Sequence, residues 1–280
     1  HPGVGNYWAL RHYYQALSPA DIEKQPTLMA AESVLYSVLM NTEKSEYWYQ
    51  RLKEYAAASR GNARSEANGQ VFYLDIVLPH RGSREIARIL PTLFSALHGS
   101  GNVLRPVSLT NNQPSLMNGG KDFCEWSKRD KELALLIGKP VSMLLGKYGK
   151  GLVNEALGES YFEKGTDDFA VHAYLSKAFL EAESNGKTEL HFAVVGIQAR
   201  MNLLNGAPGI ARERLESIRK KVDEGDSPAL LENMDALGCR ISLYENDAAA
   251  VEKWMKQAPD EIQEFYTANR YLYMTKLRCY

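Results

Sequence analysis

Apolar residues recur at helical spacing along this chain, in pairs of stretches separated by short breaks. In the stretch 27–40, for example, Leu28, Ala31 and Leu35 lie on one side of a helix. The breaks fall at small or turn-forming residues whose spacings are 41, 83, 41 and 40 positions, and 83 is close to two periods. The five landmark residues are Asn41, Gly82, Gly165, Gly206 and Asn246. A fixed period of this length with two helices per unit is typical of a helical solenoid.

The pattern predicts helical pairs along most of the chain and no sheet of consequence. The predicted pairs are 27–40 with 43–58, 66–78 with 83–97, 152–164 with 169–184, 189–205 with 209–222, and 228–245 with 248–257. A helix over 122–137 is expected to break at Lys139-Pro140 and to resume at Val141, because proline lacks an amide hydrogen. The stretch 260–280 is expected to form the first helix of a further pair.

The expected fold is all-α, a right-handed helical-hairpin solenoid with about six to seven repeats of about 41 residues. This repeat domain would cover residues 27–280 and follow an aromatic-rich helical segment at 1–26. Residues at about 98–121 interrupt it, because they are dense in Gly, Asn, Ser and Pro, which favour turns and loops. This loop is either a tolerated insertion between repeats or a functional segment, and the sequence leaves both readings open.

Composition gives no sign of a nucleic-acid or membrane partner. The 280 residues carry a formal net charge of −1, with 45% hydrophobic and 24% charged residues. The sequence has no apolar run of about 18 residues and no signal peptide. Cys124, Cys239 and Cys279 lie far apart in the sequence and form neither a metal-binding spacing nor an even set for disulfides. This cysteine usage fits a reducing cytosol, so we expect a cytoplasmic protein without a membrane partner.

The two ends of the sequence suggest a fragment. The chain begins His1-Pro2-Gly3 without an initiator methionine, and it stops at Tyr280 inside an apolar stretch that has no capping residue. We therefore expect these residues to be excised from a longer polypeptide.

The residues that enzymes and cofactor sites require are not grouped in the sequence. The cluster 146–151 is rich in Gly and Lys but lacks the spacing and the hydroxyl residue of a phosphate-binding loop. The six histidines form no metal-binding pair, and Asp75 has no evident partner. The basic run 212–221 contains Glu213 and Glu216, so it is expected to be a solvated helix face and not a DNA-reading helix. We expect no enzyme activity, no cofactor and no metal, although linear sequence rarely excludes a Ser-His-Asp arrangement.

Residue size also repeats when positions are counted from the landmarks. Seven residues before three of the landmarks lie small residues, and nine residues after them lie large ones. The small residues are Gly158, Ala199 and Cys239, and the large ones are Tyr174, Leu215 and Met255. Small side chains let paired helices approach closely, and large ones fill the remaining space. This order resembles the tetratricopeptide repeat, although the period is nearer 41 than the usual value of about 34 residues.

Four segments resemble the same protein family. They are AVVGIQARMNLLNGAPGIARERLESI, ALGCRISLYENDAAAVEKW, YGKGLVNEALGESYFEKG and SLMNGGKDFCEWSK. They look like the helical-repeat region of LuxR-type bacterial transcription activators related to the maltotriose-responsive activator MalT, and the resemblance covers residues 27–280. It implies a sensor region with a small-molecule or protein effector, in a parent that carries a nucleotide-binding module and a DNA-binding helix-turn-helix elsewhere. It also implies a parent that self-associates when activated.

The residue after each small position is expected to face the concave surface of the solenoid, which is the usual binding surface. These residues are Glu159, Arg200 and Arg240, and Asn202, Asn233 and Tyr244 lie near them on the same helices. Two arginines one repeat apart can bind an anion, a phosphate or an acidic peptide, and Glu159 is expected to orient Arg200. The alternative is that these charged residues form structural ion pairs between adjacent repeats.

Two main functions follow from these observations. The first is an effector-sensing domain of a LuxR-type regulator, and the second is a protein–protein scaffold with no small-molecule ligand. A narrow enclosed channel favours the first, whereas an open, shallow, polar groove favours the second. An enzyme would require a pocket in which an acid, a base and a nucleophile converge.

Overall fold

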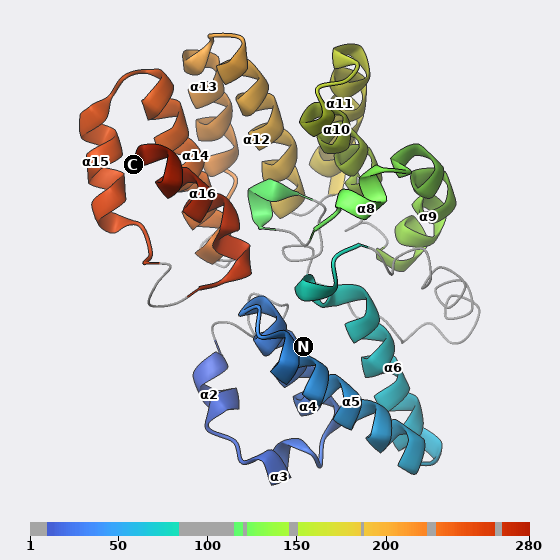
Figure 1. Ribbon diagram of the computed structural model, residues 1–280. Helices are drawn as coiled ribbons and strands as arrows, with labels where there is room; N and C mark the ends of the chain where they lie inside the picture. The colour runs from blue at the N-terminus through green and yellow to red at the C-terminus, as the bar shows by residue number, and fades with distance from the viewer. Residues whose placement is uncertain are drawn as a thin grey trace. The chain divides into compact units, whose positions relative to one another are not determined.

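The computed structural model describes residues 10–83, 115–119, 122–145, 151–185, 188–222, 228–260 and 265–280. All regular structure in these ranges is helical, and no strand occurs in them (Figure 1). The predicted all-α class is therefore confirmed for this part of the chain. The chain divides into two compact units, which we call unit 1 (1–112 and 121–129) and unit 2 (113–120 and 130–280).

Unit 1 is built around three helices that pack against one another. Its elements are α2 (Arg11–Gln15), α3 (Pro19–Ile22), α4 (Pro26–Val38), α5 (Thr42–Ala58), α6 (Gly61–Val77), η1 (Pro79–Arg81) and α8 (Cys124–Ser127). Helices α4, α5 and α6 contact each other and enclose apolar side chains such as Met29, Leu52 and Leu74, which are 0–1% exposed. Burial of these side chains supplies the main stabilisation of the unit.

Unit 2 contains the longer run of helices. Its elements are η3 (Leu116–Asn118), α9 (Asp130–Leu145), α10 (Leu152–Lys164), α11 (Asp168–Asn185), α12 (Thr188–Leu204), α13 (Pro208–Arg219), α14 (Pro228–Tyr244), α15 (Ala248–Gln257), η5 (Thr267–Asn269) and α16 (Arg270–Cys279). Helices pack in consecutive pairs, α10 with α11, α12 with α13 and α14 with α15. Contacts also join α10 to α12, α12 to α14 and α14 to α16, so these four helices form one row (Figure 1).

Left-handed backbone ends four of the helices near the predicted landmarks. At these four helix ends the residues with positive φ are Met40, Gly165, Gly206 and Asn246, with φ between 58° and 71°. The residue after each donates its amide to a carbonyl five residues back, for example Asp247 N to Ser242 O at 2.9 Å. Asn41, Asp167 and Asp247 then cap the next helix through their side chains. At the first landmark the left-handed residue is Met40, so Asn41 begins the second helix and does not end the first.

Helices α10 and α11 approach closely where the sequence pattern places a small residue. A Cβ atom added to Gly158 would lie 2.6 Å from Leu175 Cδ2, so no larger residue fits without movement. Leu175 and Val194 belong to one hydrophobic cluster of unit 2, and α12, α14 and α16 share a second cluster around Phe192 and Tyr271. The apolar residues therefore form the interior between consecutive helices.

Two helix predictions were wrong. Helix α9 runs without a break through Lys139 and Pro140, because a proline removes one hydrogen bond and need not end a helix that packs against a neighbour. The stretch 260–280 is not one helix, since Tyr266 is extended and α16 begins only at Arg270. The preceding turn is buried and hydrogen-bonded to α14, and these tertiary contacts override the local helical pattern.

Several other predictions fall on residues outside the described ranges. These are the N-terminal residues 1–9, most of the helix at 83–97, the cluster 146–150, and the loop at 98–121 apart from residues 115–119. Within the described residues, no helix has both the length and the apolar character needed to cross a membrane.

Candidate functional site

Polar side chains gather on the row of helices α10, α12, α14 and α16. Three of them, Glu155, Glu159 and Glu163, are spaced four residues apart on α10 and therefore lie on one face. The full set, which we call the polar row, is Glu155, Glu159, Glu163, Arg200, Arg240, Tyr271 and Thr275. The structure thus brings together Glu159, Arg200 and Arg240, three of the six residues that the sequence suggested.

Arg200 is held by a different carboxylate from the one expected. Its Nη1 donates to Glu163 Oε1 at 2.6 Å, and its guanidinium lies 4.7 Å from the centre of the Phe162 ring. Glu159 lies near enough for the charge of Arg200 to act on its pKa, but it forms no hydrogen bond with Arg200. The prediction that Glu159 orients Arg200 is therefore corrected to Glu163, one helical turn further along α10.

Arg240 is a buried cation without a counter-ion among the described residues. It is 5% exposed, its Nε donates to Thr275 Oγ1 at 2.7 Å, and its guanidinium lies 4.2 Å from the Tyr271 ring centre. Its Nη2 is buried and has no hydrogen-bond partner in the described structure. Burial lowers the pKa of Arg240, and the charges of Arg278 and Arg200 act in the same direction.

Glu155 and Glu159 form a buried carboxyl pair on α10. Burial raises the pKa of Glu159 to about 7, even though its Oε1 accepts a hydrogen bond from the Leu116 amide at 2.9 Å. Burial, together with the neighbouring charge of Glu159, raises the pKa of Glu155 well above its ordinary value. Neither oxygen of Glu155 has a partner of normal hydrogen-bond geometry in the described structure. The pair therefore retains a proton much more readily than exposed glutamates do.

The described part of the predicted loop, residues 115–119, docks against the same row of helices. Met117 is fully buried, and a Cβ atom on Gly196 of α12 would lie 2.5 Å from Met117 Cε. The Asn118 side-chain amide donates to the Glu189 carbonyl at 2.8 Å. Gly119 has φ +62°, and a Cβ atom on it would lie 2.6 Å from the Ala268 carbonyl carbon. These contacts give residues 115–119 a structural role in unit 2, which a merely tolerated insertion would lack.

The other three predicted residues lie in different surroundings. Asn233 is 1% exposed, and its side-chain amide donates to the Ala268 carbonyl at 2.7 Å, so it ties α14 to the turn before α16. The Nδ2 atom of Asn202 is buried without a hydrogen-bond partner in the described structure. Tyr244 is 45% exposed at the end of α14. Of these three residues, Asn233 is the one that joins helices of the row through a hydrogen bond between described residues.

The sequence analysis missed four members of the polar row. Glu155 and Glu163 carried a usable signal, because they lie four residues on either side of Glu159 in a predicted helix. Tyr271 and Thr275 carried no such signal in the sequence. The predicted start of α16 was wrong, so the residues on each face of that helix could not be identified.

A separate cavity of about 770 Å³ lies between α9, α10 and α11. Its lining includes Lys131, Tyr174, Lys177 and Glu181, and Asn154 Nδ2 donates to Glu181 at 2.7 Å. The cavity is open to solvent, and none of the six predicted residues lines it. It offers space for a ligand, but none of its described lining residues has a buried polar side-chain atom without a partner.

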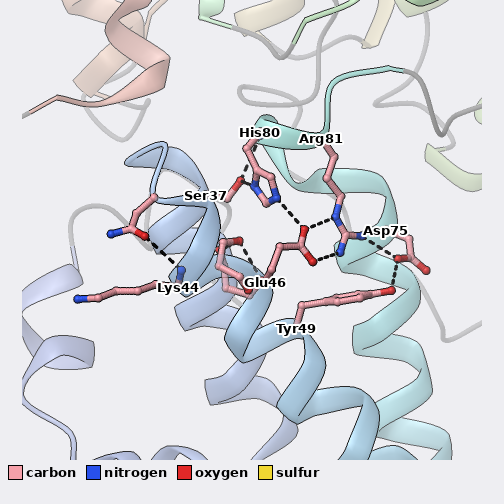
Figure 2. Close-up of polar contacts among 10 residues, drawn as sticks. Ser37, Lys44, Glu46, Tyr49, Asp75, His80 and Arg81 are labelled. Carbon is pink, nitrogen blue, oxygen red and sulfur yellow. Dashed lines mark hydrogen bonds and ion pairs between the residues drawn. The ribbon is translucent and has the colours of Figure 1, made fainter.

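Unit 1 contains a serine, a histidine and a glutamate in hydrogen-bonded order (Figure 2). His80 Nδ1 lies 2.7 Å from Ser37 Oγ, and His80 Nε2 lies 2.8 Å from Glu46 Oε1. Arg81 bonds Glu46 through two nitrogens and also bonds Asp75, which accepts from Tyr49 as well, so the prediction that Asp75 has no partner was wrong. Ser37 is fully buried, and the ring nitrogens are used in the reverse of the order found in serine hydrolases. The geometry is that of a structural network joining α4, α5 and η1.

We expect Ser37 to be unreactive. A fluorophosphonate probe, followed by mass spectrometry, should leave the Ser37 peptide unlabelled, because the hydroxyl is 0% exposed and already bonds His80. Ser37→Ala should lower the thermal stability of unit 1, since it leaves a buried ring nitrogen without its partner. Stoichiometric labelling of Ser37 in the folded protein would contradict this assignment.

The described residues contain no group of three or more His, Cys, Asp or Glu side chains placed to hold a metal ion. Comparison of the chain with protein-family models, curated proteins and solved structures finds no match.

Proposed function

We propose that this chain is the effector-sensing, helical-repeat region of a LuxR-type, MalT-like bacterial transcription regulator, and that its effector binds at the polar row. The main support for this site is the buried guanidinium of Arg240, whose Nη2 has no hydrogen-bond partner among the described residues. The pairwise packing of α10–α15 and the row α10–α12–α14–α16 support a solenoid of helical hairpins. The four segments that resemble that family support the sensor role.

The polar row suits an anionic group on the effector. A buried cation without a counter-ion costs several kcal/mol, so an anion that pairs with Arg240 would recover much of that cost. Arg200 lies close enough to Arg240 to lower its pKa, and the Tyr271 hydroxyl is buried without a partner in the described structure. Two guanidinium groups and a phenol hydroxyl can together bind a carboxylate or a phosphate.

The effector would act by preferring one state of the parent regulator. A ligand shifts an equilibrium only by its difference in affinity for the two states. We propose that binding at the polar row favours the active, self-associating state. In such a regulator DNA is bound by another domain, and this region itself binds neither DNA nor a cofactor.

The decisive variant is Arg240→Met, which keeps much of the side-chain volume and removes the charge. Without ligand, we expect Arg240→Met to unfold at a higher temperature than the natural protein, because an uncompensated buried charge is lost. With dicarboxylates, phosphates or sugar phosphates at about 100 times Kd, the natural protein should gain about 2.7 kcal/mol, and the variant nothing. Arg212→Met is the control, since Arg212 is a half-exposed arginine that already pairs with Glu245.

The two readings of Arg240 give opposite results. A structural arginine predicts that Arg240→Met lowers the melting temperature, with any ligand response unchanged. If neutral sugars stabilise both proteins equally, the sensor function is supported, but the effector site does not include Arg240.

The alternative function is a protein–protein scaffold, and α11 favours it. Phe169 and Leu180 are 84% and 67% exposed, and they lie eleven residues apart on one face of α11. Large exposed apolar side chains aligned on one helix are a common feature of protein interfaces. A partner whose binding is lost with Phe169→Ser, but kept with Arg240→Met, would favour the scaffold.

A further inference from the structure

Two thiols from distant parts of the sequence lie side by side in unit 2. Cys239 Sγ, on α14, is 3.5 Å from Cys279 Sγ, at the end of α16. Cys239 is buried, and Cys279 is partly exposed. Their pairing could not be predicted from the sequence, because 40 residues separate them and the third cysteine leaves the set odd.

We propose that Cys239 and Cys279 form a reversible disulfide when the protein meets a peroxide oxidant. A disulfide requires a sulfur–sulfur distance of about 2.05 Å, so the two sulfurs must approach by about 1.5 Å. Because Cys279 is the last residue of α16, side-chain rotation and a small movement of that helix end can supply this approach. The proposal is independent of the proposed function.

The exposure of the two thiols sets the order of the chemical steps. Burial, together with the neighbouring Cys279, raises the pKa of Cys239 to about 12, so Cys239 is poorly ionised. Cys279, which solvent reaches, attacks the peroxide as a thiolate, breaks the O–O bond and becomes a sulfenic acid with release of hydroxide. The Cys239 sulfur then attacks the Cys279 sulfur and displaces a second hydroxide. The two thiol protons convert the hydroxides to water, so two thiols and one hydrogen peroxide give one disulfide and two waters.

The new bond would act on helix α16. This helix already contacts α14 through Arg240, which bonds Thr275 and stacks on Tyr271. A covalent link at Cys279 adds a fixed point at the opposite end of α16 from Tyr271. Oxidation therefore restrains the helix that provides two of the contacts of Arg240.

The test uses the whole 280-residue chain, first reduced and then titrated with hydrogen peroxide. Oxidation should lower the intact mass by about 2 Da, and digestion under non-reducing conditions should yield one peptide pair that contains Cys239 and Cys279. The oxidised protein should melt on the order of 5 °C higher than the reduced protein, because the link closes a loop of 40 residues. Dithiothreitol should reverse both changes.

Two variants serve as controls. Cys124→Ser should behave as the natural protein does, since Cys124 is exposed and takes no part. Cys279→Ser, a substitution at a partly exposed position, should fold and show neither the mass loss nor the shift in melting temperature. The proposal is overturned if peroxide leaves Cys239 open to alkylation after unfolding, or if the recovered disulfides all contain Cys124.

Discussion

Replacing Gly119 by alanine is expected to release residues 115–119 from unit 2. The added Cβ atom would collide with backbone atoms of Thr267 and Ala268, and backbone cannot move aside as a flexible side chain can. Release would expose Met117 and leave space beside Gly196, so the free energy of unfolding should fall by about 2 to 5 kcal/mol. Thermal unfolding measures the loss, and limited proteolysis should show new cleavage near residues 115–119.

A second glycine with the same φ distinguishes the effect of the steric clash on stability from the effect of backbone strain. Gly165 has the same φ of +62° as Gly119, but a Cβ atom on Gly165 would meet nothing within 4 Å. Gly165→Ala should therefore cost only the left-handed strain of about 1 kcal/mol. Met117→Ala should reproduce most of the loss of Gly119→Ala without any backbone clash. Equal losses for Gly119→Ala and Gly165→Ala, with no new cleavage, would show that the segment is not tightly docked.

The second large effect is a loss of stability as the pH rises from about 4.5 to about 7. Burial raises the folded-state pKa of Glu159 to about 7 from an ordinary value of 4.5, and it raises that of Glu155 as well. Between these values the folded protein binds more protons than the unfolded chain. The stabilisation is therefore full below about pH 4.5 and is lost as the pH passes through 7. The shift at Glu159 alone corresponds to about 3 kcal/mol.

The variant Glu155→Gln distinguishes the pH dependence caused by the buried carboxyl pair from that of the other titrating groups. The amide cannot ionise, so the variant should be more stable than the natural protein at pH 8 and nearly equal to it at pH 5. His191, whose pKa burial lowers, opposes the trend below about pH 6.5, but it is present in both proteins. Denaturant unfolding across pH 5 to 8 gives the two curves, and Glu213→Gln, at an exposed position on α13, is the control. Parallel curves for Glu155→Gln and the natural protein would refute the raised pKa.

The regular helices were predictable because their signals are local. The bounds of α10 and α15 match the predictions, since a left-handed residue or an Asp cap marks the turn between paired helices. Pro140 and the stretch before α16 were misjudged, because contacts with other helices decide whether a helix continues there. Propensity and periodicity carry no information about those contacts.

The polar row was predictable only in part, for a similar reason. Counting from the landmarks placed Glu159, Arg200 and Arg240 on neighbouring helices of the row, because each lies six residues before a landmark. The hydrogen bond from Arg200 to Glu163 depends on side-chain rotamers, and the stacking of Arg240 on Tyr271 depends on where α16 begins. The docking of Met117 depends on a segment that precedes α12 by about 70 positions in the chain, and no periodic pattern relates the two.

The assignment of residues 113–120 to unit 2 has a consequence for the order of folding during synthesis. These residues leave the ribosome before residues 121–129, which complete unit 1. They also precede α12 and α16, which η3 (Leu116–Asn118) contacts. Met117 therefore lacks its packing partners until α16, which ends at Cys279, has been synthesised. More than a hundred further residues are added to the nascent chain before that point. A single cut of the polypeptide between residues 112 and 130 cannot yield two complete units, so the two halves are expected to fold well only when joined.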